Sequence, residues 1–311
     1  MRRVIIDTDP GQDDAVALLL ALASPELEVQ AITVVAGNVP LERTVHNALV
    51  IRDLARRPGV PVYAGAAQPL VRPLVTAEYV HGVTGLDGAE LPAPLGEVAP
   101  GHAADAIIEI VRASPPNTVT LCTLGPLTNV ALALDRDPGL AERLEGIVMM
   151  GGGFFEGGNV TPAAEFNIYV DPQAAARVFD SGVSLTMMPL DVTHQVLASA
   201  QRVDRFRAMG TRVGEVVAAW LDFFDRYDTE KYGTDGAPLH DPCVIAYLLR
   251  PDLFDGQVCN VEIETSSELT MGMTVVDWWH VTDRAQNALV MANVDADRFF
   301  DLLVDRIGAL P

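Results

Sequence analysis

Apolar and polar positions follow one another in blocks whose lengths are those of strands and helices. Short β-branched runs end in polar or glycine-rich residues, and longer apolar or amphipathic segments typical of helices come after them. The expected strands are residues 4–7, 29–35, 118–124, 147–150 and 185–190. The expected helices are residues 14–23, 44–55, 103–112, 126–134 and 295–308, and a further helix that opens at Asp171-Pro172.

This alternation predicts right-handed βαβ crossovers, and therefore an α/β fold with a mostly parallel, Rossmann-like central sheet flanked by helices. Residues 198–250 favour helices apart from a polar break at 228–240, and residues 258–290 favour further β segments. Because the sequence contains no repeat or obvious linker, we expect residues 1–311 to form a single domain.

Four aspartates lie in the turn between the first strand and the first helix: Asp7, Asp9, Asp13 and Asp14. Like charges repel strongly at close range in a crevice of low dielectric, so a bound cation would stabilise the cluster. Carboxylate oxygens favour a hard ion, Ca²⁺ or Mg²⁺. The alternative is that Asp13 and Asp14 only cap the helix.

A fifth carboxylate, Asp241, stands next to a titratable histidine, His240. This pair could divide two tasks, with His240 donating a proton and Asp241 binding metal. Asp241 followed by Pro242 is also typical of a helix N-cap and first turn, which would give Asp241 a purely structural role.

A glycine-rich segment, residues 157–168, supplies paired hydrogen-bond donors and acceptors from Asn159, Glu165 and Asn167. Such a set suits the hydroxyl groups of a sugar, although glycine-rich loops with ordinary Asx turns have the same composition. Residues 64–100 form a long loop in which His81 could belong to a substrate cover. The helical spacing of Trp220, Phe223, Phe224 and Tyr227 favours core packing over base stacking.

The composition excludes several functions. A formal charge of −21 disfavours nucleic acids and anionic membranes as partners. The only lysine is Lys231, so a Walker A loop is absent. No apolar run reaches the length of a membrane span, about 18 residues. Three widely spaced cysteines match no zinc motif and fit reduced thiols in the cytoplasm.

Four motifs in register resemble the inosine-uridine preferring nucleoside hydrolase family over nearly the whole chain. They are residues 7–15 (DTDPGQDDA), residues 125–129 (GPLTN), the block of residues 149–168 with MGG, GN and AEFNI, and residues 239–242 (LHDP). The resemblance implies a Ca²⁺ enzyme that hydrolyses the N-glycosidic bond of ribonucleosides, with a helical cover over the active site. It also implies a homo-oligomer, a dimer or tetramer.

The resemblance also implies roles for individual residues. Calcium would be bound by Asp9, Asp14, Asp241 and the main-chain carbonyl of Leu124, a position where the family often has threonine. Asp9 would be the base for the attacking water, and His240 the acid for the leaving group. The substrate would be held by Asp13, Asn38, Met150, Asn159, Glu165, Asn167 and Asp241, and by the more variable aromatics Tyr227 and Tyr232. His81 is a further substrate-binding candidate, from its place in the long loop. Asp7 would support the other aspartates of the turn without binding the substrate or the metal itself.

Two alternatives stay open at this point. A haloacid-dehalogenase-like phosphohydrolase also carries an Asp-x-Asp turn and binds a hard cation. Such an enzyme usually also uses a lysine, and Lys231 lies near no second aspartate pair at a strand end. A non-catalytic nucleoside or sugar sensor could use the same scaffold. The preference between purine and pyrimidine bases, and between inosine and uridine, is not determined by these motifs.

Overall fold

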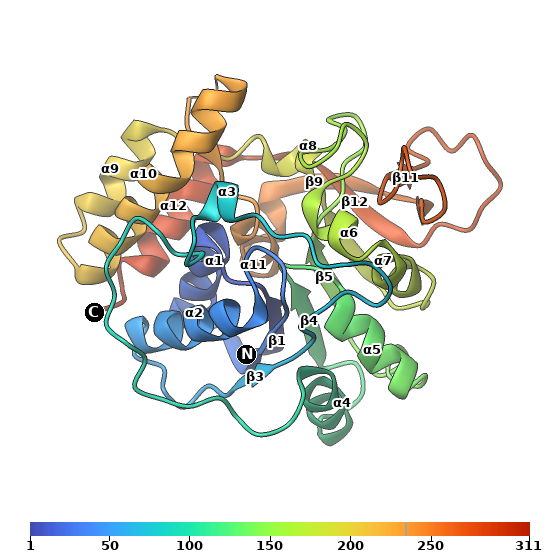
Figure 1. Ribbon diagram of the computed structural model, residues 1–311, viewed down its shortest axis with the longest axis horizontal. Helices are drawn as coiled ribbons and strands as arrows, with labels where there is room; N and C mark the ends of the chain where they lie inside the picture. Colours follow the sequence, from blue (N-terminus) through green and yellow to red (C-terminus); the bar gives the residue numbers. More distant parts are fainter. Residues whose placement is uncertain (234) are drawn as a thin grey trace.

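An eight-stranded sheet forms the centre of the computed structural model, which describes residues 1–233 and 235–311 apart from the side chains of residues 227–232 (Figure 1). In spatial order its strands are β3 (Val62–Ala64), β2 (Leu27–Val34), β1 (Arg2–Thr8), β4 (Val119–Thr123), β5 (Gly146–Met150), β6 (Leu185–Met188), β12 (Ala288–Val294) and β9 (Phe254–Cys259). Neighbouring strands are parallel except β9, which is antiparallel to β12. The predicted α/β class with a mostly parallel sheet is confirmed.

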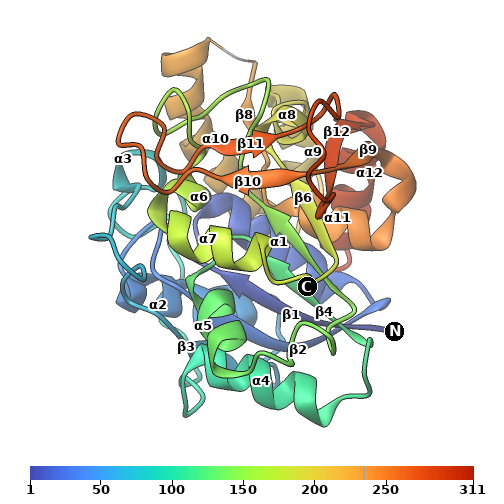
Figure 2. The same cartoon turned by 90° about the vertical axis from the view of Figure 1, so that its right-hand side faces the viewer.

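Helices pack on both faces of the sheet (Figure 2). One face is covered by α1 (Gln12–Ala23), α2 (Leu41–Leu54), α9 (Ala200–Arg207), α10 (Arg212–Tyr232), α11 (Pro242–Leu249) and α12 (Ala296–Ile307). The other face is covered by α4 (Ala103–Ala113), α5 (Thr128–Arg136) and α7 (Pro172–Phe179). Strand β1 serves both cores, since Val4 and Ile6 point to the first and Ile5 to the second, as the two-residue period of a strand requires.

Helix α1 is buried on every side, which explains why residues 15–22 are apolar throughout rather than amphipathic. It contacts α2, α10, α11 and α12 as well as the sheet. This enclosure fixes the start of α1, and with it the aspartate turn. Within the described residues, no helix is both long and apolar enough to cross a lipid bilayer.

Several elements are too short for a periodic pattern to predict. They are α3 (Glu78–His81), α6 (Phe166–Val170), α8 (Leu190–Thr193), the 3₁₀ turn Pro251–Leu253, and two small sheets that pair β7 (Leu197–Ala198) with β8 (Ala237–Pro238) and β10 (Val261–Ile263) with β11 (Thr274–Val276). The break expected at residues 228–240 was placed to begin too early, because α10 continues to Tyr232. Glu and Lys are good helix formers, so the polar composition of this segment did not end the helix.

The direction of winding reverses at β1, which lies between β2 and β4. In such sheets, ligands bind beyond the carboxyl ends of the strands at this switch point. The aspartate turn follows β1, Asn38 follows β2, and Leu124 directly follows β4. The topology therefore brings these three segments to one place.

Candidate functional site

Asp14 organises the turn between β1 and α1. Its Oδ1 accepts a hydrogen bond from the Thr8 hydroxyl at 2.5 Å, and its Oδ2 accepts from the Gly11 N–H at 3.0 Å and from Asn38 Nδ2 at 3.1 Å. The bond from Gly11, the N-cap of α1, is a capping contact, so Asp14 does cap the helix, as the structural alternative proposed. Asp14 also ties the turn to the segment after β2, and its carboxylate therefore has a fixed position.

The Asp9 carboxylate is enclosed by backbone and has one oxygen without a partner. Asp9 Oδ2 accepts a hydrogen bond from the Asn38 N–H at 2.7 Å, whereas Oδ1 is buried with no hydrogen-bond partner among the described residues. A Cβ atom at Gly37 would lie 2.0 Å from Asp9 Oδ2, and one at Gly125 would lie 2.1 Å from Oδ1. The two glycines therefore make room for a carboxylate that has spare acceptor capacity.

Three carboxylates meet at the pocket end of this turn. Oxygen atoms of Asp13, Asp14 and Asp241 lie within 4.8 Å of one another, and all three side chains are buried. Burial, followed by the charge of Asp14, raises the pKa of Asp13 to about 7. Burial and then the charges of Asp13, Asp14 and Asp9 raise the pKa of Asp241 well above its usual range. Asp9 is not part of this close group.

Asp241 is the N-cap residue of α11 and Pro242 is in its first turn, as expected, but the Asp241 side chain makes no capping hydrogen bond. The purely structural interpretation of Asp241 is therefore wrong. Its carboxylate instead interacts with Asp13 and Asp14. A buried cluster of this kind needs either protons or a cation, and an all-oxygen donor set with an unpartnered Asp9 Oδ1 beside it fits a hard metal ion.

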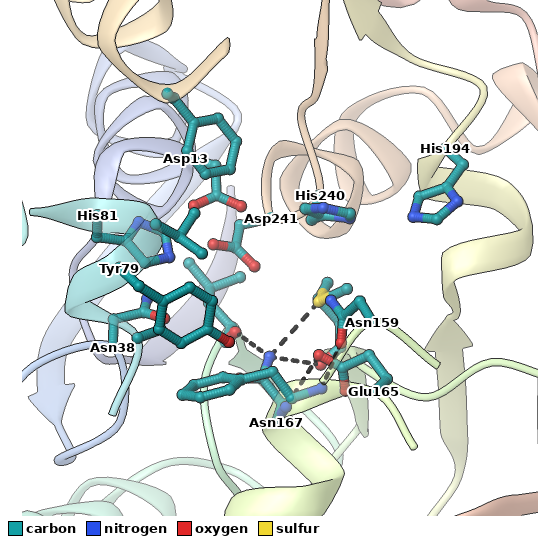
Figure 3. Close-up of a pocket in the computed structure, with 16 residues that line it drawn as sticks. Asp13, Asn38, Tyr79, His81, Asn159, Glu165, Asn167, His194, His240 and Asp241 are labelled. Carbon is teal, nitrogen blue, oxygen red and sulfur yellow. Dashed lines mark hydrogen bonds between the residues drawn. The ribbon is translucent and has the colours of Figure 1, made fainter. Parts of the chain in front are cut away.

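A pocket opens next to the cluster (Figure 3). Its lining includes ten of the residues expected at the site: Asp13, Asn38, His81, Leu124, Met150, Asn159, Glu165, Asn167, His240 and Asp241. Asp9 and Asp14 are fully buried and do not line it. The side chains of Tyr227 and Tyr232 lie outside the described part of the chain.

One wall of the pocket carries amide and carboxyl groups. Glu165, the N-cap of α6, accepts hydrogen bonds from the N–H groups of Gly152 and Asn167, both at 2.9 Å. Burial raises the pKa of Glu165 to about 7. Asn167 Nδ2 donates to the carbonyls of Leu124 at 2.7 Å and Met150 at 3.3 Å. This wall is held rigidly by its own hydrogen bonds.

His240 lies on the other side of the cluster, and α8 holds it in place. Its Nδ1 is 2.7 Å from the Thr193 hydroxyl, and its ring centroid is 5.7 Å from that of His194 (Figure 3). Burial, and then the neighbouring His194 and His81, lower the pKa of His240 well below its usual range. A neutral imidazole in this position can donate a hydrogen bond from one ring nitrogen only.

Sequence reasoning missed several pocket residues: Ala77, Tyr79, Val80, Phe166, His194 and Phe224. Phe224 is buried, as expected, but it also lines the pocket and stacks on His81 with ring centroids 5.4 Å apart. Trp220 does lie in the core, where its Nε1 donates to the Leu86 carbonyl. His194 lies in the short helical turn after β6, and this position beyond a strand end is the sequence feature that could have indicated a site residue.

The Asp191 carboxylate holds part of the segment between β5 and α6. Asp191 accepts hydrogen bonds from the N–H groups of Phe154, Phe155 and Glu156, at 2.9, 2.8 and 3.1 Å. Phe154 also stacks on Trp278. Because Asp191 belongs to α8, the same short helix positions both this segment and His240.

Comparison with known proteins identifies the family. The model of the inosine-uridine preferring nucleoside hydrolases matches residues 4–301. The chain belongs to this family. It is 55% identical over 309 residues to an uncharacterized protein of Schizosaccharomyces pombe, covering 99% of this chain and 100% of that one. It is 50% identical over 305 residues to the pyrimidine-specific ribonucleoside hydrolase RihA of Salmonella agona, covering 98% and 97% of the two chains.

Solved structures agree with this assignment. A purine-preferring ribonucleoside hydrolase from Gardnerella vaginalis superposes with a TM-score of 0.93 at 33% identity, with 99% of each chain covered. A plant nucleoside hydrolase gives a TM-score of 0.92 at 34% identity, again over 99% of each chain. This nucleoside hydrolase is therefore an enzyme that acts on N-glycosyl compounds, and the phosphohydrolase and sensor alternatives do not apply to it.

Proposed function

We propose that this nucleoside hydrolase uses Ca²⁺ to cleave the N-glycosidic bond of ribonucleosides, with pyrimidine ribonucleosides such as uridine among its substrates, in nucleoside salvage. The observation that carries the proposal is the buried Asp13–Asp14–Asp241 cluster at the edge of a pocket lined by hydroxyl-binding side chains. The 50% identity to pyrimidine-specific hydrolases supports the pyrimidine substrates.

The metal would be held by Asp9, Asp14, Asp241 and the Leu124 carbonyl. The closeness of Asp14 to Asp241 and the spare oxygen of Asp9 support this set. When bound, Ca²⁺ polarises water and lowers its pKa. Asp13 also belongs to the close carboxylate group, and we assign it to a ribose hydroxyl because it lines the pocket whereas Asp14 does not.

The protein residues account for the remaining steps. Asn38, Asn159, Glu165 and Asn167 hold the ribose together with Asp13 and Asp241, while Met150 packs against the sugar. Asp9 takes the proton of the attacking water. As the bond between C1′ and the base nitrogen lengthens, the sugar gains positive charge, and the surrounding carboxylates stabilise it.

The leaving base meets His240. The low pKa of this residue favours a neutral imidazole that stabilises the departing base by a hydrogen bond from Nε2, with the Thr193 hydroxyl on Nδ1. His240 therefore acts as a neutral hydrogen-bond donor, because burial disfavours its protonated form.

We expect His240→Ala to lower kcat for uridine about 10²-fold, because the departing base loses its hydrogen-bond donor. A nitrophenyl riboside has a leaving group that departs without a proton, so its hydrolysis should stay close to that of the wild type. Steady-state kinetics with both substrates provide the check. An equal loss with both would show that His240 acts on something other than the leaving group.

We expect Asp191→Ala to raise the KM for uridine about 10-fold, because three backbone N–H groups of the segment leading to Asn159 lose their acceptor. Asp191→Asn keeps one oxygen and should have a smaller effect. Both variants are measured by kinetics and thermal unfolding. An unchanged KM in the alanine variant would mean that this segment keeps its shape without Asp191.

A panel of ribonucleosides and deoxyribonucleosides, assayed for release of the free sugar, tests the proposed activity as a whole. Metal-dependent release from ribonucleosides is expected, and tight binding without release would contradict it. We further propose that residues 1–311 form one nucleoside hydrolase domain, active in the cytoplasm as a homo-oligomer. The three buried free cysteines support a reducing compartment.

A further inference from the structure

Gln12 lies inside the aspartate turn and links it to the segment that carries His81. It is the first residue of α1 and is fully buried. Its Nε2 donates to the main-chain carbonyls of His81 at 2.9 Å and Asp87 at 3.1 Å. Its Oε1 is 2.7 Å from His81 Nδ1. All the hydrogen-bonding atoms of this amide are therefore used on the segment from His81 to Asp87.

The two carbonyls determine which way the amide faces. A carbonyl oxygen can only accept a hydrogen bond, so the NH₂ group of Gln12 must point to both of them. Oε1 is then the atom that faces His81 Nδ1, and because Oε1 can only accept, Nδ1 must carry the hydrogen. A neutral imidazole has one N–H group, which leaves His81 Nε2 as a bare acceptor.

The imidazole is held neutral and in place. Burial lowers the pKa of His81 to about 3, so the ring carries no charge at neutral pH. The ring stacks on Phe224 of α10 at an interplanar angle of 21°. It lines the pocket on the side opposite His240 (Figure 3), and Nε2 has no partner among the described residues.

Three of the groups assigned to ribose, those of Asn159, Glu165 and Asn167, lie on a different part of the pocket from His81 (Figure 3). The flat aromatic wall of His81 and Phe224 suits the base instead. We propose that Gln12 fixes His81 as a hydrogen-bond acceptor, so that this site selects bases whose ring nitrogen on the edge facing His81 carries a hydrogen. Gln12 is then a positioning residue that sets base specificity without touching the substrate.

The predicted preference between bases depends on the proposed ribonucleoside hydrolase activity. Uracil carries a hydrogen on N3, whereas N3 of cytosine is a bare acceptor that would face the lone pair of Nε2. A buried acceptor without a donor costs enough to change rates about 10-fold or more. The kcat/KM for uridine should therefore exceed that for cytidine about 10-fold in the wild type. In Gln12→Leu, where either ring nitrogen can carry the hydrogen, the ratio should fall toward one.

Asn47 offers a matched control. Its Nδ2 donates to the carbonyls of Pro10 at 2.9 Å and Thr84 at 2.8 Å, so it joins the same turn to the same segment without contacting His81. Asn47→Leu should loosen that connection yet retain the uridine preference. Loss of the preference in both variants would attribute it to the packing of the segment and overturn the role of Gln12.

The tautomer of His81 can be measured whether or not the protein is active. Long-range ¹H–¹⁵N NMR of the full chain, with signals assigned by their loss in His81→Asn, distinguishes a hydrogen on Nδ1 from one on Nε2. A hydrogen on Nδ1 is expected in the wild type, and a mixture in Gln12→Leu. A hydrogen on Nε2 in the wild type overturns the inference. If no ribonucleoside is hydrolysed, the proposed function fails, and the NMR result still decides the tautomer.

Discussion

Asp9→Asn is expected to lower kcat for uridine about 10³-fold or more while the protein folds normally. The asparagine keeps the shape that Gly37 and Gly125 accommodate, but it cannot take a proton from water. It also removes a negative charge from a site where Asp9 contributes to the raised pKa of Asp241. Single-turnover kinetics, together with thermal unfolding of the same preparation, separate loss of chemistry from loss of fold.

Asp7→Asn is the control for this experiment. Asp7 lies in the same turn, is equally buried, and like Asp9 has an Oδ1 atom without a hydrogen-bond partner among the described residues. Its Oδ2, however, is held by the Thr33 hydroxyl at 2.6 Å and by Asn129 Nδ2 at 2.9 Å, and no carboxylate of the close group interacts with it. We expect Asp7→Asn to lower kcat for uridine less than about 10-fold, because Asp7 only supports the residues of the site. If the two variants were equally inactive, the loss would reflect the turn as a whole, and Asp9 would not be the base.

Removing divalent cations is expected to have a comparably large effect. EDTA should abolish uridine hydrolysis, and Ca²⁺ in excess should restore it. Calcium at about 100 times its Kd should stabilise the fold by about 2.7 kcal/mol, which corresponds to a rise in Tm of about 4 °C for a chain of this length. Asp14→Asn should remove most of that rise. Hydrolysis at the full rate in EDTA would rule out the metal.

The stabilisation of the fold by Ca²⁺ should depend on pH. Burial raises the pKa values of Asp7, Asp13 and Glu165 to about 7, and it raises those of Asp9 and Asp241 well above their usual range. These five carboxyl groups outnumber His81 and His240, whose pKa values burial lowers. Without metal, the folded protein therefore holds more protons than the unfolded chain between about pH 4 and pH 7. Stability of the metal-free protein therefore falls as pH rises through that range. Because Ca²⁺ needs ionised carboxylates, its effect on Tm should grow from pH 5 to pH 8. Unfolding scans with Ca²⁺ or EDTA at each pH measure this difference.

The sequence by itself determined the fold class and most of the site. Alternating strand and helix patterns are local properties, and they predicted the order of β1, β2, β4, β5 and β6 and of the helices between them. The rule that ligands bind at the carboxyl ends of parallel strands then brought Asp13, Asn38 and Leu124 to one edge. The family motifs contributed most of the remaining candidates, and ten of all the candidates line one pocket.

Only the tertiary structure decided what each carboxylate does, because the role depends on neighbours distant in sequence. Asp241 has the sequence of a helix cap, yet its side chain belongs to the cluster with Asp13 and Asp14. Phe224 has the spacing of a core residue, yet it stacks on His81 because the long loop of residues 64–100 returns over α10. The hydrogen on His81 likewise depends on Gln12, 69 residues earlier in the chain.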